Sequence, residues 1–508
     1  MTLVSVKFIL FSLVVLLLYY VLPKKFRWII LLAASYIFYF LSSKFLTIFI
    51  ILSSISVYIT GLLINKQNKK IDKNNIELNK KIKRNKKLFL LFAVLLNVAF
   101  LLVLKYSNFF IDISNSIFKT NFGFVKILLP LGISYYTLEA ISYIADIYMG
   151  KYEASKNFFA VNLFLIFFPT ITEGPICKFN DVSPKLMNGN SIKYENLING
   201  AGLMLFGYFK KLVIADRAGI YVNNVFGNTS LSGSVVFFAI ALYTIQIYAE
   251  FSGCMDIVCG LSKMLGIDLP KNFERPFFSK SIQEFWRRWH KTLGVWLKDY
   301  VFYPISFSKL ITRISKFSRK KLSKNLAKFL PVASSLFFVW FLNGFWHGAS
   351  FKYILYGLYY YIVMMIGLLL KPYTDKLLNK LKINIKSKGY GLFQTIRTTL
   401  LVFVGMMLFR SKTITAAIDM FKSIFRCSKE KLTSFGLTNI DFIIILIGII
   451  LLFIYGILEE KGIDVVDKLN KKPLVIRYLV YLIICLSIIV FGIYGPGYNP
   501  ADFIYGQF

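Results

Sequence analysis

The sequence predicts an all-α, polytopic membrane protein with about 11 to 13 transmembrane or re-entrant helices and one interfacial amphipathic helix. Apolar residues make up 56% of the 508 residues and charged residues only 17%, whereas a soluble domain carries about 25% charged residues. Apolar stretches of about 20 residues recur from end to end, which is the length that crosses a hydrocarbon layer of roughly 30 Å. This composition excludes an ordinary soluble enzyme.

The apolar stretches divide the chain into three expected regions: N-terminal transmembrane helices with a basic loop (1–104), a core that holds both histidines (105–410), and C-terminal transmembrane helices (411–508). No small-residue cleavage site follows the first stretch, so it is expected to remain as a span. The stretches lie near residues 5–22, 28–42, 45–64, 88–104, 127–148, 158–172, 200–222, 233–265, 331–347, 351–370, 394–410, 440–457 and 474–494.

The net charge of +36 is concentrated in three loops. Residues 66–87 hold ten Lys or Arg and two acids, residues 309–328 hold eight and none, and residues 371–388 hold six and one. Short loops rich in Lys and Arg stay in the cytoplasm, so these loops are expected at the inner face. The charge is therefore interpreted as topogenic, and no nucleic-acid partner is expected because no nucleic-acid module is visible.

Two of these loops bracket a predicted hairpin. If both lie inside, the chain between them crosses an even number of times, and the interval holds two apolar runs, 331–347 and 351–370. A helix that begins at Pro331 rises about 24 Å by His347 at 1.5 Å per residue. His347 is thus expected deep in the protein, toward the outer half of the membrane.

The chain has only two histidines, His290 and His347. Imidazole is the side chain best suited to moving a proton near neutral pH, and an ionisable residue at membrane depth is a functional candidate. Glycines at 344 and 348 would let the backbone or a ligand approach His347 closely. The alternative is a satisfied core residue or part of an aromatic interfacial belt.

His290 lies in a stretch with helical periodicity. Ser281 and Glu284 form an S-x-x-E capping box before it. One side of the expected helix carries Phe285, Trp289, Leu293, Trp296 and Tyr300. We expect an amphipathic helix at the inner interface, whose basic, tryptophan-rich collar gathers an anionic donor and directs it to His290. The alternative is a plain surface anchor with solvated arginines.

Other candidate chemistry is sparse. Glu250 and Asp256 lie in an apolar stretch, and Asp256 is expected to pair with an arginine as a buried structural ion pair in preference to a catalytic role. The five cysteines show no C-x-x-C pair or metal-ligand spacing, so neither a disulfide framework nor a metal site is expected. No Walker, G-x-S-x-G or H-E-x-x-H motif is visible.

Three segments, residues 272–277, 281–290 and 296–300, together resemble the signature of the membrane-bound O-acyltransferase family, and specifically its bacterial alginate O-acetylase branch. Residues 343–350 are similar to that family's catalytic-histidine segment. The resemblance runs from about residue 125 to the C-terminus, with further similarity at residues 129–134, 168–169, 174–176, 251–256, 409–410 and 503–508. The sequence departs from the family pattern at Glu173, Cys254, Glu274 and residues 305–308.

The resemblance implies transfer of an acyl group from a cytoplasmic thioester to a hydroxyl on an extracytoplasmic polysaccharide, across a bacterial cell membrane whose lipids surround the protein. Acetyl-CoA is the expected donor substrate, no bound cofactor is expected, and a separate extracytoplasmic protein is expected to finish delivery. The expected catalytic residues are His347 and His290, the donor-binding residues are Arg287, Arg288, Lys291, Trp286 and Trp289, and the supporting residues are Asn343, Trp346, Asp299 and Asp256.

Three alternatives stay open. Within the family, the chain could transfer D-alanine from a carrier protein to teichoic acid, although its length and C-terminal spans favour the acetylase branch. From other classes, it could be a polysaccharide transporter or flippase, or a scaffold for a synthase complex. The last two predict that replacing His347 is tolerated.

Overall fold

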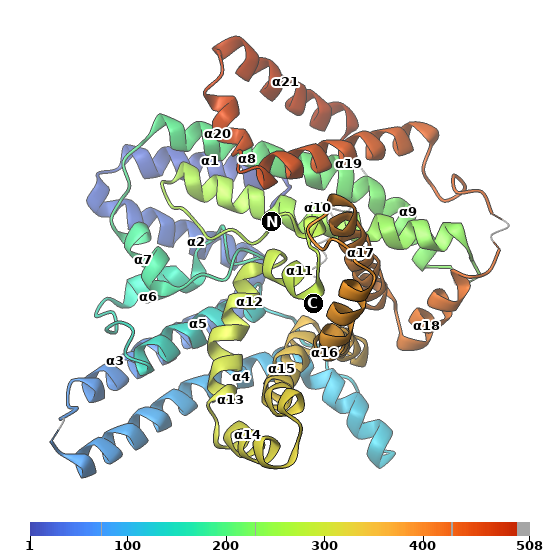
Figure 1. Cartoon of the computed structure of the whole chain (residues 1–508). Helices are drawn as coiled ribbons and strands as arrows, with labels where there is room; N and C mark the ends of the chain where they lie inside the picture. The colour runs from blue at the N-terminus through green and yellow to red at the C-terminus, as the bar shows by residue number, and fades with distance from the viewer. Residues whose placement is uncertain (73, 229, 428–429, 495–508) are drawn as a thin grey trace. The chain divides into compact units, whose positions relative to one another are not determined.

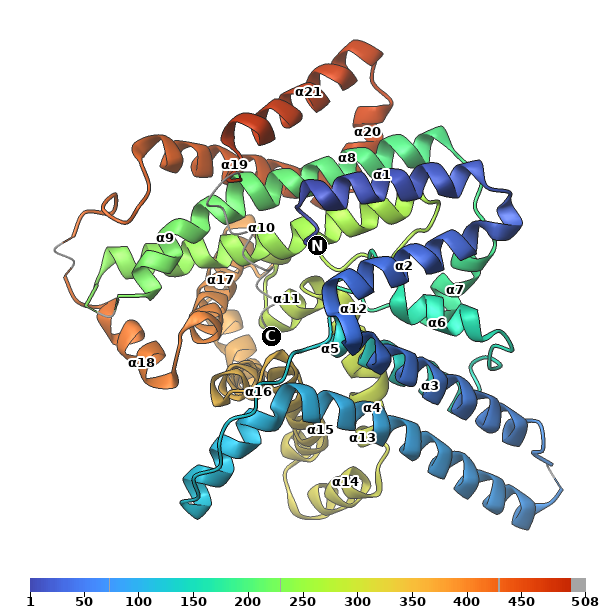
Figure 2. The same ribbon diagram turned by 180° about the vertical axis from the view of Figure 1, so that it is seen from behind.

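Helices are the only regular elements in the part of the chain that the structure describes. The computed structural model describes residues 1–72, 74–228, 230–427 and 430–494, and no strand occurs in them. These residues form two compact units: Met1–Gly207 with Cys254–Pro270, and Tyr208–Gly253 with the described residues from Lys271 onward. The all-α prediction is confirmed (Figures 1 and 2).

The first unit is built around two largely buried helices, α5 and α6, against which the neighbouring helices α3 and α7 pack. Nearly every side chain of α5 is buried, and these include the polar side chains of Glu139 and Asp146. The helices of this unit are α1 (Val6–Val21), α2 (Arg27–Ser43), α3 (Thr47–Asn68), α4 (Ile76–Phe118), α5 (Ile133–Tyr148), α6 (Phe158–Ile166), α7 (Phe179–Met187), most of α8 (Tyr194–Tyr208) and the C-terminal end of α10 (Ser234–Met264).

The second unit carries both histidines. Its helices are the π-helical turn η3 (Phe209–Ala215), α9 (Asp216–Phe226), most of α10, the 3-10 turn η4 (Pro276–Phe278), α11 (Ile282–Arg288), α12 (Lys291–Leu297), the π-helical turn η5 (Lys298–Phe302), α13 (Tyr303–Ser306), α14 (Lys309–Lys321), α15 (Lys324–His347), α16 (Phe351–Lys380), α17 (Lys388–Arg410), α18 (Ile414–Ser423), α19 (Asn439–Glu460), α20 (Val465–Asn470) and α21 (Leu474–Phe491).

Nine helical stretches of the described residues are long and apolar enough to cross a membrane, and α1 is a shorter apolar helix. One stretch, Lys24–Asn68, contains both α2 and α3. The polytopic prediction is therefore confirmed. Two expected spans are shorter than predicted, because α5 begins only at Ile133 and α6 ends at Ile166. The similarity at residues 503–508 lies outside the described residues.

The predicted hairpin between the second and third basic loops is present as α15 and α16, which lie side by side and pack against each other (Figures 1 and 2). The turn between them contains Gly348, and α16 begins after Ser350. Most of the basic loop 309–328 is helical, as α14 and the start of α15, and Ser308 caps the start of α14 by accepting from the Ile311 N–H. The hairpin places His347 at the last residue of α15.

Candidate functional site

The prediction of a single helix over residues 285–300 is wrong, because the chain forms two short helices with His290 between them. α11 ends at Arg288, and His290 adopts a left-handed backbone conformation with φ 45° before α12 begins at Lys291. Half of the predicted capping box is present, since the Ser281 hydroxyl accepts from the Glu284 N–H at 3.2 Å. The Glu284 carboxylate instead accepts from the N–H of Lys280.

Asn272 explains why the helix breaks at this residue. Its side-chain oxygen accepts the backbone N–H of Thr292 at 3.1 Å and the Thr292 hydroxyl at 2.8 Å, while its backbone carbonyl accepts the N–H of Lys291. It therefore caps the first turn of α12 from outside the helix. Because Glu274 also donates its N–H to the Arg288 carbonyl, residues 272–274 hold the two short helices at this angle.

The same amide oxygen orients the His290 ring. Nδ1 of His290 lies 3.1 Å from Oδ1 of Asn272, and an amide oxygen can only accept, so Nδ1 carries the hydrogen and Nε2 the lone pair. The ring is 2% exposed, and burial lowers the pKa of His290 to about 3. His290 is therefore a neutral, fixed imidazole at physiological pH.

His347 is buried among aromatic rings at the end of α15. Its ring contacts Tyr356 and Phe409 edge-on, with centroids 5.7 and 5.3 Å apart. The two glycines allow close contact with Tyr353 of α16, whereas the expected approach of backbone or a ligand to the imidazole stays a prediction. A Cβ on Gly344 would lie 2.3 Å from the Tyr353 carbonyl oxygen, and one on Gly348 would lie 2.5 Å from the Tyr353 ring.

Trp346 brings the two histidines together. Its indole lies 6.0 Å from the His290 ring and 5.1 Å from the His347 ring, centroid to centroid. Phe251, from α10, closes the other side of His290 at 4.9 Å. His290 and His347, which are 57 positions apart, therefore share one aromatic neighbour.

The two predicted donor-binding tryptophans occupy different places. Trp289 is buried and packs with Tyr248, Phe273, Phe277 and Phe285. Trp286 is half-buried against the hairpin, 5.1 Å from Trp340 and 4.9 Å from Tyr360. Trp289 thus lies in the packed interior next to His290, while the side chain of Trp286 packs α11 against α15 and α16.

The four predicted supporting residues are spread over several elements. Asn343 is buried on α15 and Trp346 follows it one turn later. Asp299 is half-buried in η5, next to α12. Asp256 is half-buried on the part of α10 that belongs to the first unit, so its pairing with an arginine stays a prediction.

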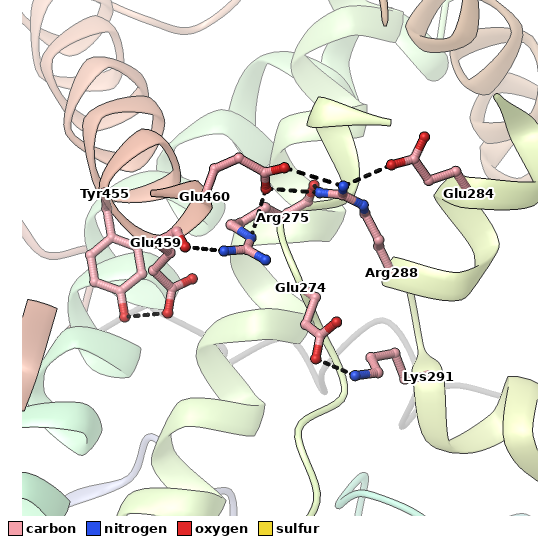
Figure 3. Close-up of polar contacts among 8 residues, drawn as sticks. All are labelled: Glu274, Arg275, Glu284, Arg288, Lys291, Tyr455, Glu459 and Glu460. Atoms are coloured by element: carbon pink, nitrogen blue, oxygen red, sulfur yellow. Dashed lines mark hydrogen bonds and ion pairs between the residues drawn. The ribbon is translucent and has the colours of Figure 1, made fainter. Parts of the chain in front are cut away.

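The predicted basic collar is largely neutralised by carboxylates. Arg288 contacts Glu460 at 2.9 and 3.2 Å and Glu284 at 2.7 Å, and Lys291 is paired with Glu274. Figure 3 shows Arg288, Glu284 and Glu460 joined at the end of α19, and Lys291 with Glu274 as a separate pair. Arg275 joins the cluster around Glu460 by contacting the Glu460 carboxylate at 3.0 Å and the Glu459 carbonyl.

Arg287 differs from its neighbours. It is exposed and forms no ion pair within the described ranges. Among the three cations predicted to gather the donor, it is the one whose charge is not already balanced by a carboxylate. The predicted attraction of an anionic donor to this helix, if it occurs, thus depends on Arg287.

Two features of the second unit were missed in the sequence. Glu460 pairs with arginines that precede it by more than 170 residues, and no local pattern indicates this. The second is a buried ion cluster in which the Lys211 ammonium lies 2.8 Å from both Asp216 and Glu250. Lys211 in the apolar stretch 200–222, followed five residues later by Asp216, could have signalled it.

The site offers no arrangement for a metal. In the described part of the chain, no group of three or more His, Cys, Asp or Glu side chains could hold a metal ion. The arrangement provides a fixed neutral imidazole at His290, a second imidazole packed among aromatic rings at His347, and the exposed cation of Arg287 on α11. These groups can move a proton and attract an anionic substrate.

Comparison with known proteins gives a family match and several bacterial relatives. The MBOAT, membrane-bound O-acyltransferase family model matches residues 154–380, which include both histidines. A probable alginate O-acetylase of Pseudomonas syringae pv. tomato is 30% identical over 413 residues, covering 80% of this chain and 72% of that protein. A Helicobacter pylori peptidoglycan O-acetyltransferase is 32% identical over 308 residues, covering 55% of each. A Bacillus subtilis teichoic acid D-alanyltransferase is 30% identical over 239 residues, covering 46% of this chain and 58% of that protein.

Proposed function

The chain belongs to the membrane-bound O-acyltransferase family, and we propose that it moves an acetyl group from cytoplasmic acetyl-CoA to a hydroxyl of an extracytoplasmic polysaccharide, or of a partner protein that delivers the group. It is a multi-pass O-acyltransferase of a bacterial membrane. The observation that carries the proposal is the contact of His290 and His347 with the same indole ring of Trp346.

The reaction requires one proton to leave the acceptor and one thioester bond to break. His347 takes the proton from the acceptor hydroxyl, whose oxygen attacks the thioester carbonyl carbon. The tetrahedral intermediate then expels the CoA sulfur, which leaves as the thiolate and gains a proton on release. A well-placed general base of this kind contributes about 10²- to 10⁴-fold to the rate.

His290 has a different task. A base that holds a proton during the reaction works best with a pKa near the operating pH, whereas burial lowers the pKa of His290 to about 3. Its Nδ1 hydrogen is directed at Asn272, so Nε2 acts as a hydrogen-bond acceptor that orients the acceptor hydroxyl or the donor. The proposal therefore assigns proton removal to His347 and positioning to His290.

Transfer of D-alanine is the second candidate, and the similarity to a teichoic acid D-alanyltransferase is the observation that favours it. That match covers 46% of this chain, whereas the match to the alginate O-acetylase covers 80%. The greater shared length supports acetyl transfer. The two candidates differ in donor, because D-alanine arrives on a carrier protein and acetyl on a free CoA thioester.

The test uses purified full-length protein embedded in the membrane of liposomes, together with its extracytoplasmic partner. Labelled acetyl-CoA is supplied on the side of the basic loops and candidate glycans on the opposite side. We expect labelled O-acetyl glycan with the natural sequence and about 10²- to 10⁴-fold less with His347→Ala, while donor binding is kept because proton removal is not a donor contact. His347→Gln serves as the matched variant of similar size. Near-normal acylation by well-folded His347→Ala would contradict the proposal and favour a transporter or scaffold.

A further inference from the structure

The hairpin of α14 and the start of α15 is a basic surface that the proposed acyl transfer does not use. α14 packs on α15 through Ile311 and Ser318, which are its buried side chains. The Ser318 hydroxyl donates to the Ala327 carbonyl at 3.2 Å, which ties the two helices together near their turn. The remaining faces of α14 are available to other molecules.

A second face of α14 is apolar and open. Leu310 and Phe317 lie two turns apart on one side and are 54% and 58% exposed, and Phe307, just before the helix, is 82% exposed. Beside this apolar row runs a basic row made of Lys309, Arg313, Lys316 and Lys320, all exposed. An apolar row flanked by cations is the pattern of a helix that lies in the interface of a bilayer.

A third face contributes to an open cleft between the two helices. The cleft has a volume of about 640 Å³ and is lined by Ser315, Arg319, Leu322, Lys324, Ala327, Lys328 and Pro331. Three of these residues are cations, whereas residues 309–328 contain no acid. None of the three forms an ion pair in the described part of the chain. The cleft therefore combines uncompensated positive charge with apolar walls.

The position of the cleft along α15 indicates its depth. Lys324 and Lys328 lie in the first turns of this helix, and its apolar run begins at Pro331. Lys328 thus precedes the apolar run by about 4.5 Å at 1.5 Å per residue, which is the level of the lipid headgroups. A soluble phosphate ligand would need no apolar wall there, whereas a phospholipid uses both the cations and the wall.

We propose that the cleft between α14 and α15 binds the phosphate of an anionic phospholipid through Arg319, Lys324 and Lys328, with the lipid chains along Leu322 and Pro331. Clusters of Lys and Arg immediately beside a transmembrane helix attract anionic headgroups. The lipid fixes the α14 hairpin to its leaflet. This site is separate from the histidines and does not depend on the acyl-transfer proposal.

The experiment measures lipid preference with purified, delipidated full-length protein and fluorescent phosphatidylglycerol or phosphatidylcholine. We expect phosphatidylglycerol to bind at least about ten-fold tighter, and the variant Arg319→Gln, Lys324→Gln, Lys328→Gln to lose this preference. The matched control removes three cations from another basic stretch, with Lys371→Gln, Lys376→Gln and Lys380→Gln, and should keep the preference. Equal loss in both variants would mean non-specific attraction and overturn the proposal.

Two further experiments distinguish a lipid from a soluble phosphate ligand and test the site in a protein that carries no substitution. Glycerol phosphate or inorganic phosphate at millimolar concentration should not compete, and full competition would identify a soluble phosphate site instead of a lipid site. In the unaltered protein, a photoreactive phosphatidylglycerol should label peptides between Ser315 and Pro331. Labelling confined to other parts of the chain would refute the proposed site without any substitution.

Discussion

Replacing Glu460 by Gln tests whether the ion-pair cluster at the end of α19 positions His290. Glu460 forms ion pairs with Arg288 and Arg275. Arg288 lies two residues before His290, and Arg275 lies two residues before Phe277, which packs against Phe285 of α11. Both Arg275 and His290 have positive φ angles, 50° and 45°, which cost energy for residues other than glycine. The cluster therefore stabilises a strained segment from outside.

The size of the effect follows from burial. The side chains are 38% exposed for Glu460, 19% for Arg288 and 24% for Arg275. Exposed ion pairs contribute about 0.2–1 kcal/mol and buried hydrogen bonds to charged groups about 1.5–3 kcal/mol, so these partly exposed contacts together contribute about 1–2 kcal/mol. Glu460→Gln is thus expected to lower kcat about 5- to 30-fold, at about 1.4 kcal/mol per factor of ten.

The assay compares kcat and the donor KM for acetyl transfer by Glu460→Gln, Arg288→Gln and the double variant. Positioning predicts a lower kcat, an unchanged KM and less than additive losses in the double variant. Glu459→Gln, one residue earlier on α19, is the matched control because it removes one negative charge and keeps the backbone carbonyl that accepts from Arg275. We expect little change in kcat or KM for this variant. A lower donor KM in Glu460→Gln would refute the reasoning, because it would mean that Arg288, once released, binds the donor.

Three other outcomes are expected. Arg287→Gln should raise the donor KM and weaken its salt dependence, whereas Lys376→Gln should not; an unchanged KM would favour a plain surface anchor. Because burial lowers the pKa of His290 to about 3, against about 6.5 in the unfolded chain, only the unfolded chain gains a proton between these values. Stability in detergent should therefore be complete above about pH 6.5 and fall by about 2 kcal/mol at pH 5, with a smaller fall for His290→Gln in thermal scans. Gly344→Ala should lower the thermal midpoint, since its Cβ would lie 2.3 Å from a backbone oxygen, while Gly367→Ala, with nothing within 4 Å, should be neutral.

The fold class and the hairpin could be predicted from the sequence because they depend on neighbours along the chain. The length of an apolar stretch decides whether a helix can span a bilayer, and the basic loops on either side of residues 331–370 require an even number of crossings. The position of His347 at the end of α15 follows from the same reasoning. The start of α11 was also readable, since Ser281 caps it locally.

The inner arrangement of the site could not be predicted in this way. Residues 285–300 have the period of one helix, yet Asn272, 18 residues before His290, caps a second helix and turns the ring. The sequence predicted that the charge of Arg288 is available to a substrate, whereas Arg288 is paired with Glu460, 172 residues away. Lys211 and Glu250, 39 residues apart, likewise form a buried pair. A charged residue in each apolar stretch indicates a buried ion pair, but the local sequence does not identify the partner across that separation.

The sequence by itself determined that this chain is an all-helical membrane protein with two histidine segments, because composition and periodicity are sums over adjacent residues. Only the tertiary structure decided that Trp346 lies against both imidazoles, which nitrogen of His290 carries the hydrogen, and which cations keep an unbalanced charge. The physical reason is that hydrogen bonds and ion pairs form between groups that the folded path of the chain brings within about 3 Å, and their separation in sequence carries no information about that distance.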